Sequence, residues 1–217
     1  MKSAISNSDP LKISISAARL SLAASVAALL SLASLHILSP EFDPSWRVVS
    51  EYALGHYGWV LSLMFFAWAL SSWALVFAIR PEVRTIGGRI GLVFLVAAGV
   101  GEAMASVFDL RRPELHGLAG ALGIPSLPIA AMLISVSLSR THRWFPTKKV
   151  LLWTANLTWM SLALMGAAMF SLTRKIGGLK VSIGWPNRLL IVIYLLWVMT
   201  VAWQAIQLGG KHIVVPK

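Results

Sequence analysis

The chain has 217 residues, of which 57% are hydrophobic and only 12% are charged. Because water-soluble domains carry about 25% charged residues, this composition excludes an ordinary soluble enzyme and is typical of a protein with several membrane spans. The net charge of +11 comes from Lys and Arg scattered over short segments between apolar runs, so we attribute it to membrane topology and predict no nucleic-acid partner. The lack of cysteine excludes disulfides, thiolate metal sites and cysteine nucleophiles.

Six apolar runs follow one another along the chain, and each is long enough to cross a membrane as a helix of about 20 residues. We therefore predict an all-α fold, a polytopic membrane protein with a single bundle of six transmembrane helices over residues 20–208. Residues 1–19 precede this bundle, and residues 209–217 form a short basic tail after it. The predicted spans are 20–38, 56–79, 90–108, 118–138, 150–172 and 187–208.

The distribution of Lys and Arg predicts how the bundle is oriented. The two ends of the chain and the second and fourth interhelical turns carry 12 of these residues, whereas the other three loops carry 7. Since the side richer in Lys and Arg faces the cytoplasm, we expect both termini to be cytoplasmic. The first span resembles the apolar part of a signal peptide, but its length and the lack of a small-residue cleavage motif favour an uncleaved helix.

Aromatic and basic residues at the ends of the spans are predicted to anchor the bundle in the membrane. The basic run from Arg140 to Lys149 favours anionic lipid headgroups on the cytoplasmic side. Tryptophan is enriched at membrane–water interfaces, so we expect two interfacial belts. They comprise Trp46, Trp59 and Trp185 on the outer side, and Trp144, Trp153 and Trp203 on the inner side.

Polar side chains are concentrated on the side of the membrane that is predicted to be outside. The ten residues from Ser50 to Trp59, SEYALGHYGW, place hydroxyl, carboxylate, phenol, imidazole and indole groups just before the second span. Six of the eight acidic residues fall on this side or near it, and none follows Glu114. The outer ends of the helices are therefore where we expect a binding site.

Glu102 lies within the third predicted span, six residues before its end at Phe108, which corresponds to about 9 Å of helix. Ionisable side chains at such depth are costly and face the bundle interior or water, so they are candidates for function. The predicted partners of Glu102 are Arg188, at the start of the sixth span, or Arg111 and Arg112. The alternative is a purely structural role, as an ion pair or a protonated, hydrogen-bonded acid.

Small residues and prolines indicate how the third and fourth spans pack. Ala97, Gly101 and Ala105 recur at four-residue spacing, which allows another helix backbone to approach closely. Pro125 and Pro128 are expected to bend the fourth span and to free backbone carbonyls. In a membrane, such freed groups must face protein or water.

The polar residues could form either of two kinds of reactive site, a metal or haem site or a catalytic triad. His36, His56 and His116 end up at similar depth and could bind a metal or haem, but no histidine spacing motif supports this. Ser50, His116 and Asp109 could act as nucleophile, base and orienting group, although no G-x-S-x-G turn surrounds the serine. We predict no metal, no cofactor and no catalytic residue.

Several short motifs together resemble a known family. They are Ser50 and Tyr52 before Gly58-Trp59, Asp109 and His116 around the third loop, and the run RLLIVIYLLW from Arg188 to Trp197. This pattern is similar to the prokaryotic integral-membrane family catalogued as domain of unknown function 998, over about residues 20–208. The resemblance implies a six-helix protein of the prokaryotic plasma membrane, distantly DRAM-like, in a clan associated with lipid and stress biology. It implies no catalytic residues, and Glu102, Pro125 and Pro128 lie outside its motifs.

We therefore expect a non-enzymatic bundle whose outer polar pocket binds membrane lipid or a small ligand, or docks a membrane-protein partner. The alternatives are an accessory subunit of a larger membrane complex, and a membrane-embedded lipid-modifying enzyme that uses His116 and Asp109 as acid and base. The predicted pocket residues are Ser50, Glu51, Tyr52, Glu102, Asp109, His116 and Arg188.

Overall fold

The computed structural model describes residues 13–174 and 181–210, and it is all-helical over these residues. All six long helices have the length and the apolar composition needed to cross a membrane, so the predicted fold class is confirmed. Two short 3-10 helices, η1 (Val49–Leu54) and η2 (Phe145–Thr147), lie in the loops between them. The long helices are α1 (Ile15–Leu38), α2 (Gly58–Ile79), α3 (Ile86–Val107), α4 (Pro113–Ser139), α5 (Lys148–Arg174) and α6 (Gly184–Gly210).

Most helices extend a few residues beyond the predicted spans, because hydropathy detects only their apolar part. Helix α1 begins at Ile15, where the Ser14 side chain accepts a hydrogen bond from the backbone N–H of Ala17. Helix α3 begins at Ile86, capped in the same way by Thr85. Such caps satisfy backbone N–H groups that the first turn leaves free. The predicted flanking segments 1–19 and 209–217 fall largely outside the described residues, and the orientation of the termini remains a prediction.

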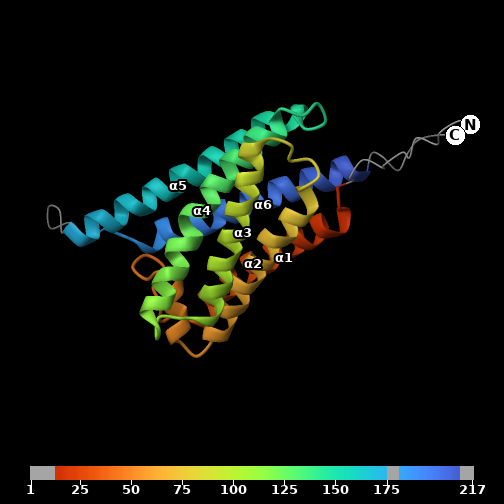
Figure 1. Cartoon of the computed structure of the whole chain (residues 1–217). Coiled ribbons are helices and arrows are strands. Elements are labelled where there is room, and N and C mark those ends of the chain that lie inside the picture. Colours follow the sequence, from red (N-terminus) through yellow and green to blue (C-terminus); the bar gives the residue numbers. More distant parts are fainter. Residues whose placement is uncertain (1–12, 175–180, 211–217) are drawn as a thin grey trace, which may run out of the picture.

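The helices form one bundle in which α3 and α4 make the most extensive contact. Figure 1 shows these two helices side by side, with α5 along one edge of the bundle beside α4 and α6. The predicted small-residue contact occurs here: a Cβ atom on Gly101 would lie only 2.6 Å from the backbone nitrogen of Gly123. Glycine at position 101 therefore allows the two backbones to touch.

Helix α4 continues through both of its prolines. Pro128 has no N–H, so the carbonyl of Ile124, four residues earlier, loses its usual helical donor. The hydroxyl of Tyr194 on α6 donates to this carbonyl at 2.9 Å. The expectation that a freed carbonyl would face protein is thus confirmed at Ile124, and the hydrogen bond links α4 to α6.

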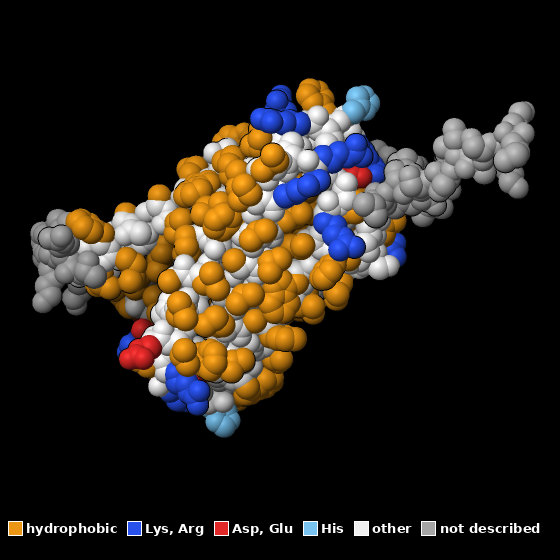
Figure 2. Space-filling model, in the orientation of Figure 1, with side chains coloured by type: hydrophobic (Ala, Val, Ile, Leu, Met, Phe, Trp, Pro, Cys, Tyr) orange, Lys and Arg blue, Asp and Glu red, His pale blue; other side chains and the backbone are white. Residues whose placement is uncertain are grey.

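On the face that Figure 2 shows, charged side chains gather at the two ends of the bundle, and hydrophobic side chains predominate between them. We call these ends the η1 end, which carries the α1–α2 loop, and the η2 end, which carries the α4–α5 loop. Five of the six tryptophans predicted as interface anchors are exposed, as expected of a belt. They are Trp46, Trp59 and Trp185 at the η1 end, and Trp153 and Trp203 toward the η2 end.

Candidate functional site

The loop between α1 and α2 folds over the helix ends and is held against α6. The side-chain oxygen of Asn187 accepts a hydrogen bond from the backbone N–H of Val49 at 2.8 Å. The backbone N–H of Gly184 donates to the carbonyl of Ser45 at 3.0 Å. A side chain at position 184 would collide with the loop, because its Cβ would lie 2.1 Å from the carbonyl oxygen of Pro44. These contacts fix η1 above the bundle interior.

Arg188 is the main anchor of this loop and is only 4% exposed. Its guanidinium donates to the Nε2 atom of His36 at 2.8 Å, to the carbonyl of Arg47 at 2.7 Å and to the hydroxyl of Tyr52 at 3.0 Å. A guanidinium can only donate, so His36 Nε2 is an acceptor and His36 Nδ1 carries the hydrogen that binds Leu32 O, 2.8 Å away. Arg188 and Tyr52, both predicted to line a pocket, instead bind each other and hold the loop in place.

Two further predicted pocket residues lie in ion pairs at the surface of the η1 end. Glu51 pairs with Arg47, four residues earlier in the chain, at 3.3 Å. Asp109 accepts hydrogen bonds from both the backbone and the guanidinium of Arg111, each at 2.9 Å. Arg111 also donates to the carbonyl of Ala53 in η1. Each pair is formed within one loop, the Arg111 bond to Ala53 joins the two loops, and Glu51 and Asp109 lie outside the cavity described next.

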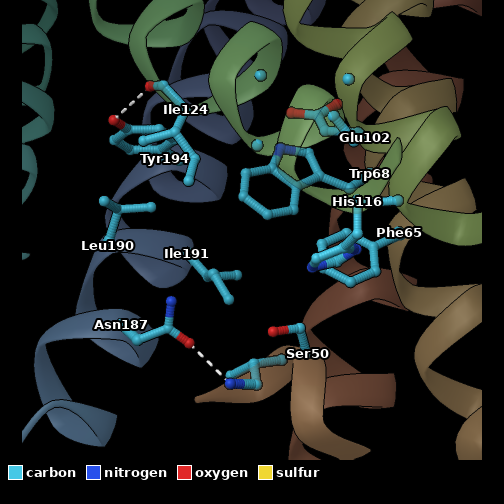
Figure 3. A pocket seen from close by; sticks show the side chains of 16 residues that line it. Ser50, Phe65, Trp68, Glu102, His116, Ile124, Asn187, Leu190, Ile191 and Tyr194 are labelled. Atoms are coloured by element: carbon cyan, nitrogen blue, oxygen red, sulfur yellow. Dashed lines mark hydrogen bonds between the residues drawn. The ribbon is translucent and has the colours of Figure 1, made fainter. Parts of the chain in front are cut away.

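A cavity of about 110 Å³ lies beneath η1, between α2, α3, α4 and α6. Figure 3 shows the side chains that face it. Its polar wall consists of Ser50, Glu102, His116 and Asn187. The other large side chains around it are apolar or aromatic: Phe65, Trp68, Ile124, Leu190, Ile191 and Tyr194.

Three of the seven predicted residues, Ser50, Glu102 and His116, therefore come together at one cavity. Sequence reasoning missed Asn187 and Trp68. Asn187 stands at the start of an apolar run, where a polar residue usually caps a helix, and Trp68 lies in the middle of another apolar run. The Trp68 indole N–H is buried and has no hydrogen-bond partner among the described residues.

Glu102 is 6% exposed, and its Oε2 atom accepts a hydrogen bond from the Ser72 hydroxyl at 2.9 Å. The predicted arginine partners of Glu102 are wrong. Arg188 binds the α1–α2 loop, Arg111 pairs with Asp109, and Arg112 lies over the Phe108 ring. All three arginines lie near helix ends, where their guanidinium groups contact other parts of the chain and not Glu102. Glu102 makes no ion pair within the described part of the chain.

His116 reaches the cavity from the first turn of α4. Its Nδ1 atom lies 2.8 Å from the carbonyl oxygen of Phe108. A carbonyl can only accept, so His116 Nδ1 carries the hydrogen, and Nε2 is the acceptor in this tautomer. In a catalytic triad a carboxylate would occupy the Nδ1 side, yet Asp109 binds Arg111 instead. The described residues also contain no group of three side chains placed to hold a metal ion.

A second polar cluster, which sequence reasoning missed, lies at the η2 end. Glu82 accepts hydrogen bonds from the Arg143 guanidinium at 3.0 Å and from the Trp144 indole at 3.3 Å. Arg143 also donates to the carbonyl of Leu208 at the end of α6. Trp144 is completely buried, so its predicted place in an interfacial belt is wrong: it packs inward because Glu82 supplies the acceptor that its N–H needs.

These features define a polytopic helical membrane protein with a small cavity, apolar with one polar wall, near one end of its bundle. The chain belongs to the family described as "Protein of unknown function (DUF998)", whose sequence model matches residues 22–204. The resemblance carried by the Ser50, Asp109 and Arg188 motifs is thereby confirmed, while the prokaryotic source and the DRAM-like affinity remain predictions. No curated protein and no solved structure matches the chain.

Proposed function

We propose that this protein is a non-enzymatic membrane binding protein, whose cavity at the η1 end holds a small ligand or the polar end of a membrane lipid. The observation that carries the proposal is the cavity itself, an apolar and aromatic chamber into which a few polar groups converge. Ligand sites in proteins typically have this composition. The buried acid Glu102 forms part of the wall, and ionisable groups inside membrane bundles commonly mark such sites.

The size of the cavity limits what it can hold. An apolar cavity of about 150 Å³ accommodates one benzene molecule. A cavity of about 110 Å³ therefore has room for a group of only a few heavy atoms. The ligand is either very small or places one small end in the cavity while the remainder stays outside.

The contacts of the polar residues favour binding over catalysis. In a serine-type triad, a carboxylate behind the histidine orients the ring and stabilises its protonated form. His116 has a backbone carbonyl in that position, and Asp109 is engaged with Arg111. The arrangement supports recognition of a ligand by Ser50, Glu102 and His116 without bond cleavage.

Two glycines on α4 provide a matched test. Gly120 lines the cavity, and a Cβ added there would meet only the end of Ile124, at 3.7 Å. Gly117, one turn earlier, is exposed, and an added Cβ would contact nothing within 4 Å. Gly120→Leu should therefore fill the cavity, while Gly117→Leu adds the same side chain outside it.

The experiment is native mass spectrometry of the purified protein after gentle extraction with a mild detergent. We expect the wild type and Gly117→Leu to retain a bound lipid or small molecule, and Gly120→Leu to lose most of it. Equal retention by Gly120→Leu and Gly117→Leu, or an empty wild-type protein, contradicts the proposal.

A further inference from the structure

The chemistry of the cavity wall indicates which ligand the cavity would select, and this inference rests on the proposed function. Glu102 is the only acidic residue in the cavity wall, and no Lys or Arg belongs to the wall as far as the chain is described. Its Oε2 atom receives one hydrogen bond from Ser72, which is neutral. Its other oxygen has no partner among the described residues. A carboxylate in such surroundings lacks a countercharge, and a buried charge is stable only when it is paired.

Two of the other polar residues in the wall, His116 and Ser50, can add acceptors to that carboxylate. His116 uses Nδ1 to donate to the Phe108 carbonyl, which leaves Nε2 as an acceptor in that tautomer. The hydroxyl of Ser50 can accept as well as donate. Of these groups only Glu102 can supply a negative charge, which a cationic ligand beside it would stabilise. The wall also contains donors, because Asn187 keeps its amide N–H groups and the Trp68 indole N–H has no partner among the described residues.

Aromatic rings cover another part of the cavity wall. Phe65 and Trp68 stack with their ring planes 7° apart, and Tyr194 meets Trp68 edge-on with ring centres 6.3 Å apart. Figure 3 shows these rings around the same space that Glu102 and His116 border. Ring faces attract cations, Trp most strongly, and the attraction grows when water is excluded.

We propose that the cavity binds a primary ammonium group, contributed either by a small free amine or by a membrane lipid whose headgroup ends in an amine. The ammonium would pair with Glu102 and donate its remaining hydrogens to His116 and Ser50, with the aromatic rings behind it. An ammonium has three donors and no acceptor, which matches the acceptors that Glu102, His116 and Ser50 can offer.

The same lining disfavours an anionic ligand. A phosphate or carboxylate in the cavity would meet Glu102 with no cation to offset the repulsion. The nearby cation Arg188 cannot take that role, because its guanidinium is already bound to His36, Tyr52 and the carbonyl of Arg47. The anionic part of a lipid headgroup would therefore remain outside the cavity.

The test compares ligands that differ in one group. Ethanolamine and ethylene glycol have nearly the same size, but only ethanolamine carries an ammonium. Binding of each to the purified protein in neutral detergent is measured by isothermal titration calorimetry. Native mass spectrometry in nanodiscs that contain equal amounts of phosphatidylethanolamine and phosphatidylglycerol tests the lipid source.

Glu102→Gln is the decisive variant, because its amide oxygen can still accept from Ser72 while the charge is removed. We expect amine binding to weaken at least about tenfold in Glu102→Gln, since charge-assisted hydrogen bonds are about twice as strong as neutral ones. Glu114→Gln, an exposed acid at the same end of the bundle, is the control and should bind as the wild type does. Ethylene glycol should bind both variants and the wild type with the same weak affinity.

The outcomes separate this inference from the function on which it rests. Binding of ethanolamine supports a free amine, whereas selective retention of phosphatidylethanolamine without ethanolamine binding supports a lipid. Equal binding of ethanolamine and ethylene glycol, or amine binding that is unchanged in Glu102→Gln, overturns the ammonium preference but leaves the cavity as a binding site. If Gly120→Leu loses a co-purifying molecule but no amine binds, the ammonium preference is likewise overturned and the cavity remains a binding site. If Gly120→Leu and Gly117→Leu also behave alike, both proposals fail.

Discussion

Glu82 and Glu102 are both buried acids, yet the structure surrounds them differently. Glu82, at the η2 end, receives hydrogen bonds from the guanidinium of Arg143 and the indole of Trp144. Glu102, toward the η1 end, receives one from a serine hydroxyl and borders a cavity. The acid at the η2 end has its countercharge within the chain and joins two loops, which is a structural role. The acid at the η1 end has room beside it and no countercharge, which is the arrangement expected of a binding site.

The largest expected effect tests whether Arg188 stabilises the α1–α2 loop and does not act as the countercharge of Glu102. Arg188→Met removes a buried guanidinium together with its hydrogen bonds to His36, Tyr52 and the loop carbonyls, so we expect it to lower the free energy of unfolding by about 4 kcal/mol. Unfolding in mixed detergent and SDS micelles, followed by circular dichroism, measures this loss.

The double variant Arg188→Met with Glu102→Gln sharpens the test. The two losses should add to within about 0.5 kcal/mol if the side chains do not interact. Coupling well above that value indicates that Arg188 neutralises Glu102. Glu102 would then be a paired acid, as Glu82 is, and the contrast between the two would disappear. Arg112→Met, an exposed arginine at the same end, is the control and should have little effect.

The second effect tests the ion pair at the η2 end. Arg143→Met leaves the carboxylate of Glu82 buried without its cation, and we expect it to cost about 3 kcal/mol in the same unfolding assay. Adding Glu82→Gln should recover part of this loss, because the double variant contains no unpaired charge. Arg140→Met changes an exposed arginine in the same loop and should be neutral. A loss no larger than that of Arg140→Met would show that the cluster contributes little.

A smaller effect is expected at the cavity wall, where Tyr194 supplies the donor that the Ile124 carbonyl lacks. Tyr194→Phe removes only the hydroxyl, so we expect a loss of about 0.6 to 1 kcal/mol, the usual range for one hydrogen bond between membrane helices. Tyr57→Phe, at a half-buried position in the loop before α2, is the matched control. Equal stability of the two variants would mean that the carbonyl finds another donor.

The smallest effect on stability is expected at Glu102 itself. Glu102→Gln keeps an acceptor for Ser72 and breaks no ion pair, so the free energy of unfolding should change by less than about 0.5 kcal/mol, or rise slightly. Glu82→Gln, which weakens a real ion pair, should cost more in the same measurement. A large loss in Glu102→Gln would assign Glu102 a structural role like that of Glu82.

Some elements of the site could be predicted from local sequence, and others could not. Glu102 stands out because an acid within an apolar run is costly wherever that run packs. Gly101 stands out because its spacing from Ala97 and Ala105 marks a helix contact, which the structure places against Gly123. The partners of these residues were harder to predict, because each polar group had several candidate partners at the same depth.

Arg188 and Trp144 illustrate that difficulty. Arg188 could have turned toward Glu102, but it binds His36, which is 152 positions away in the chain, and the loop before η1. Trp144 is of a residue type that is enriched at membrane interfaces, but its side chain packs inward because Glu82, from another loop, offers an acceptor. In both cases a long-range acceptor decided the direction of the side chain.

Hydropathy alone determined that this protein is an all-helical bundle with six spans, because each apolar run must satisfy its own backbone inside a membrane. The same local reasoning identified Ser50, Glu102 and His116 as polar groups near one end. Only the tertiary structure decided that these three share a cavity, while Tyr52 and Arg188 form an anchor and Glu51 and Asp109 lie in surface pairs. The reason is physical: burial sets the cost of a polar group, but packing of distant segments decides which partner offsets it.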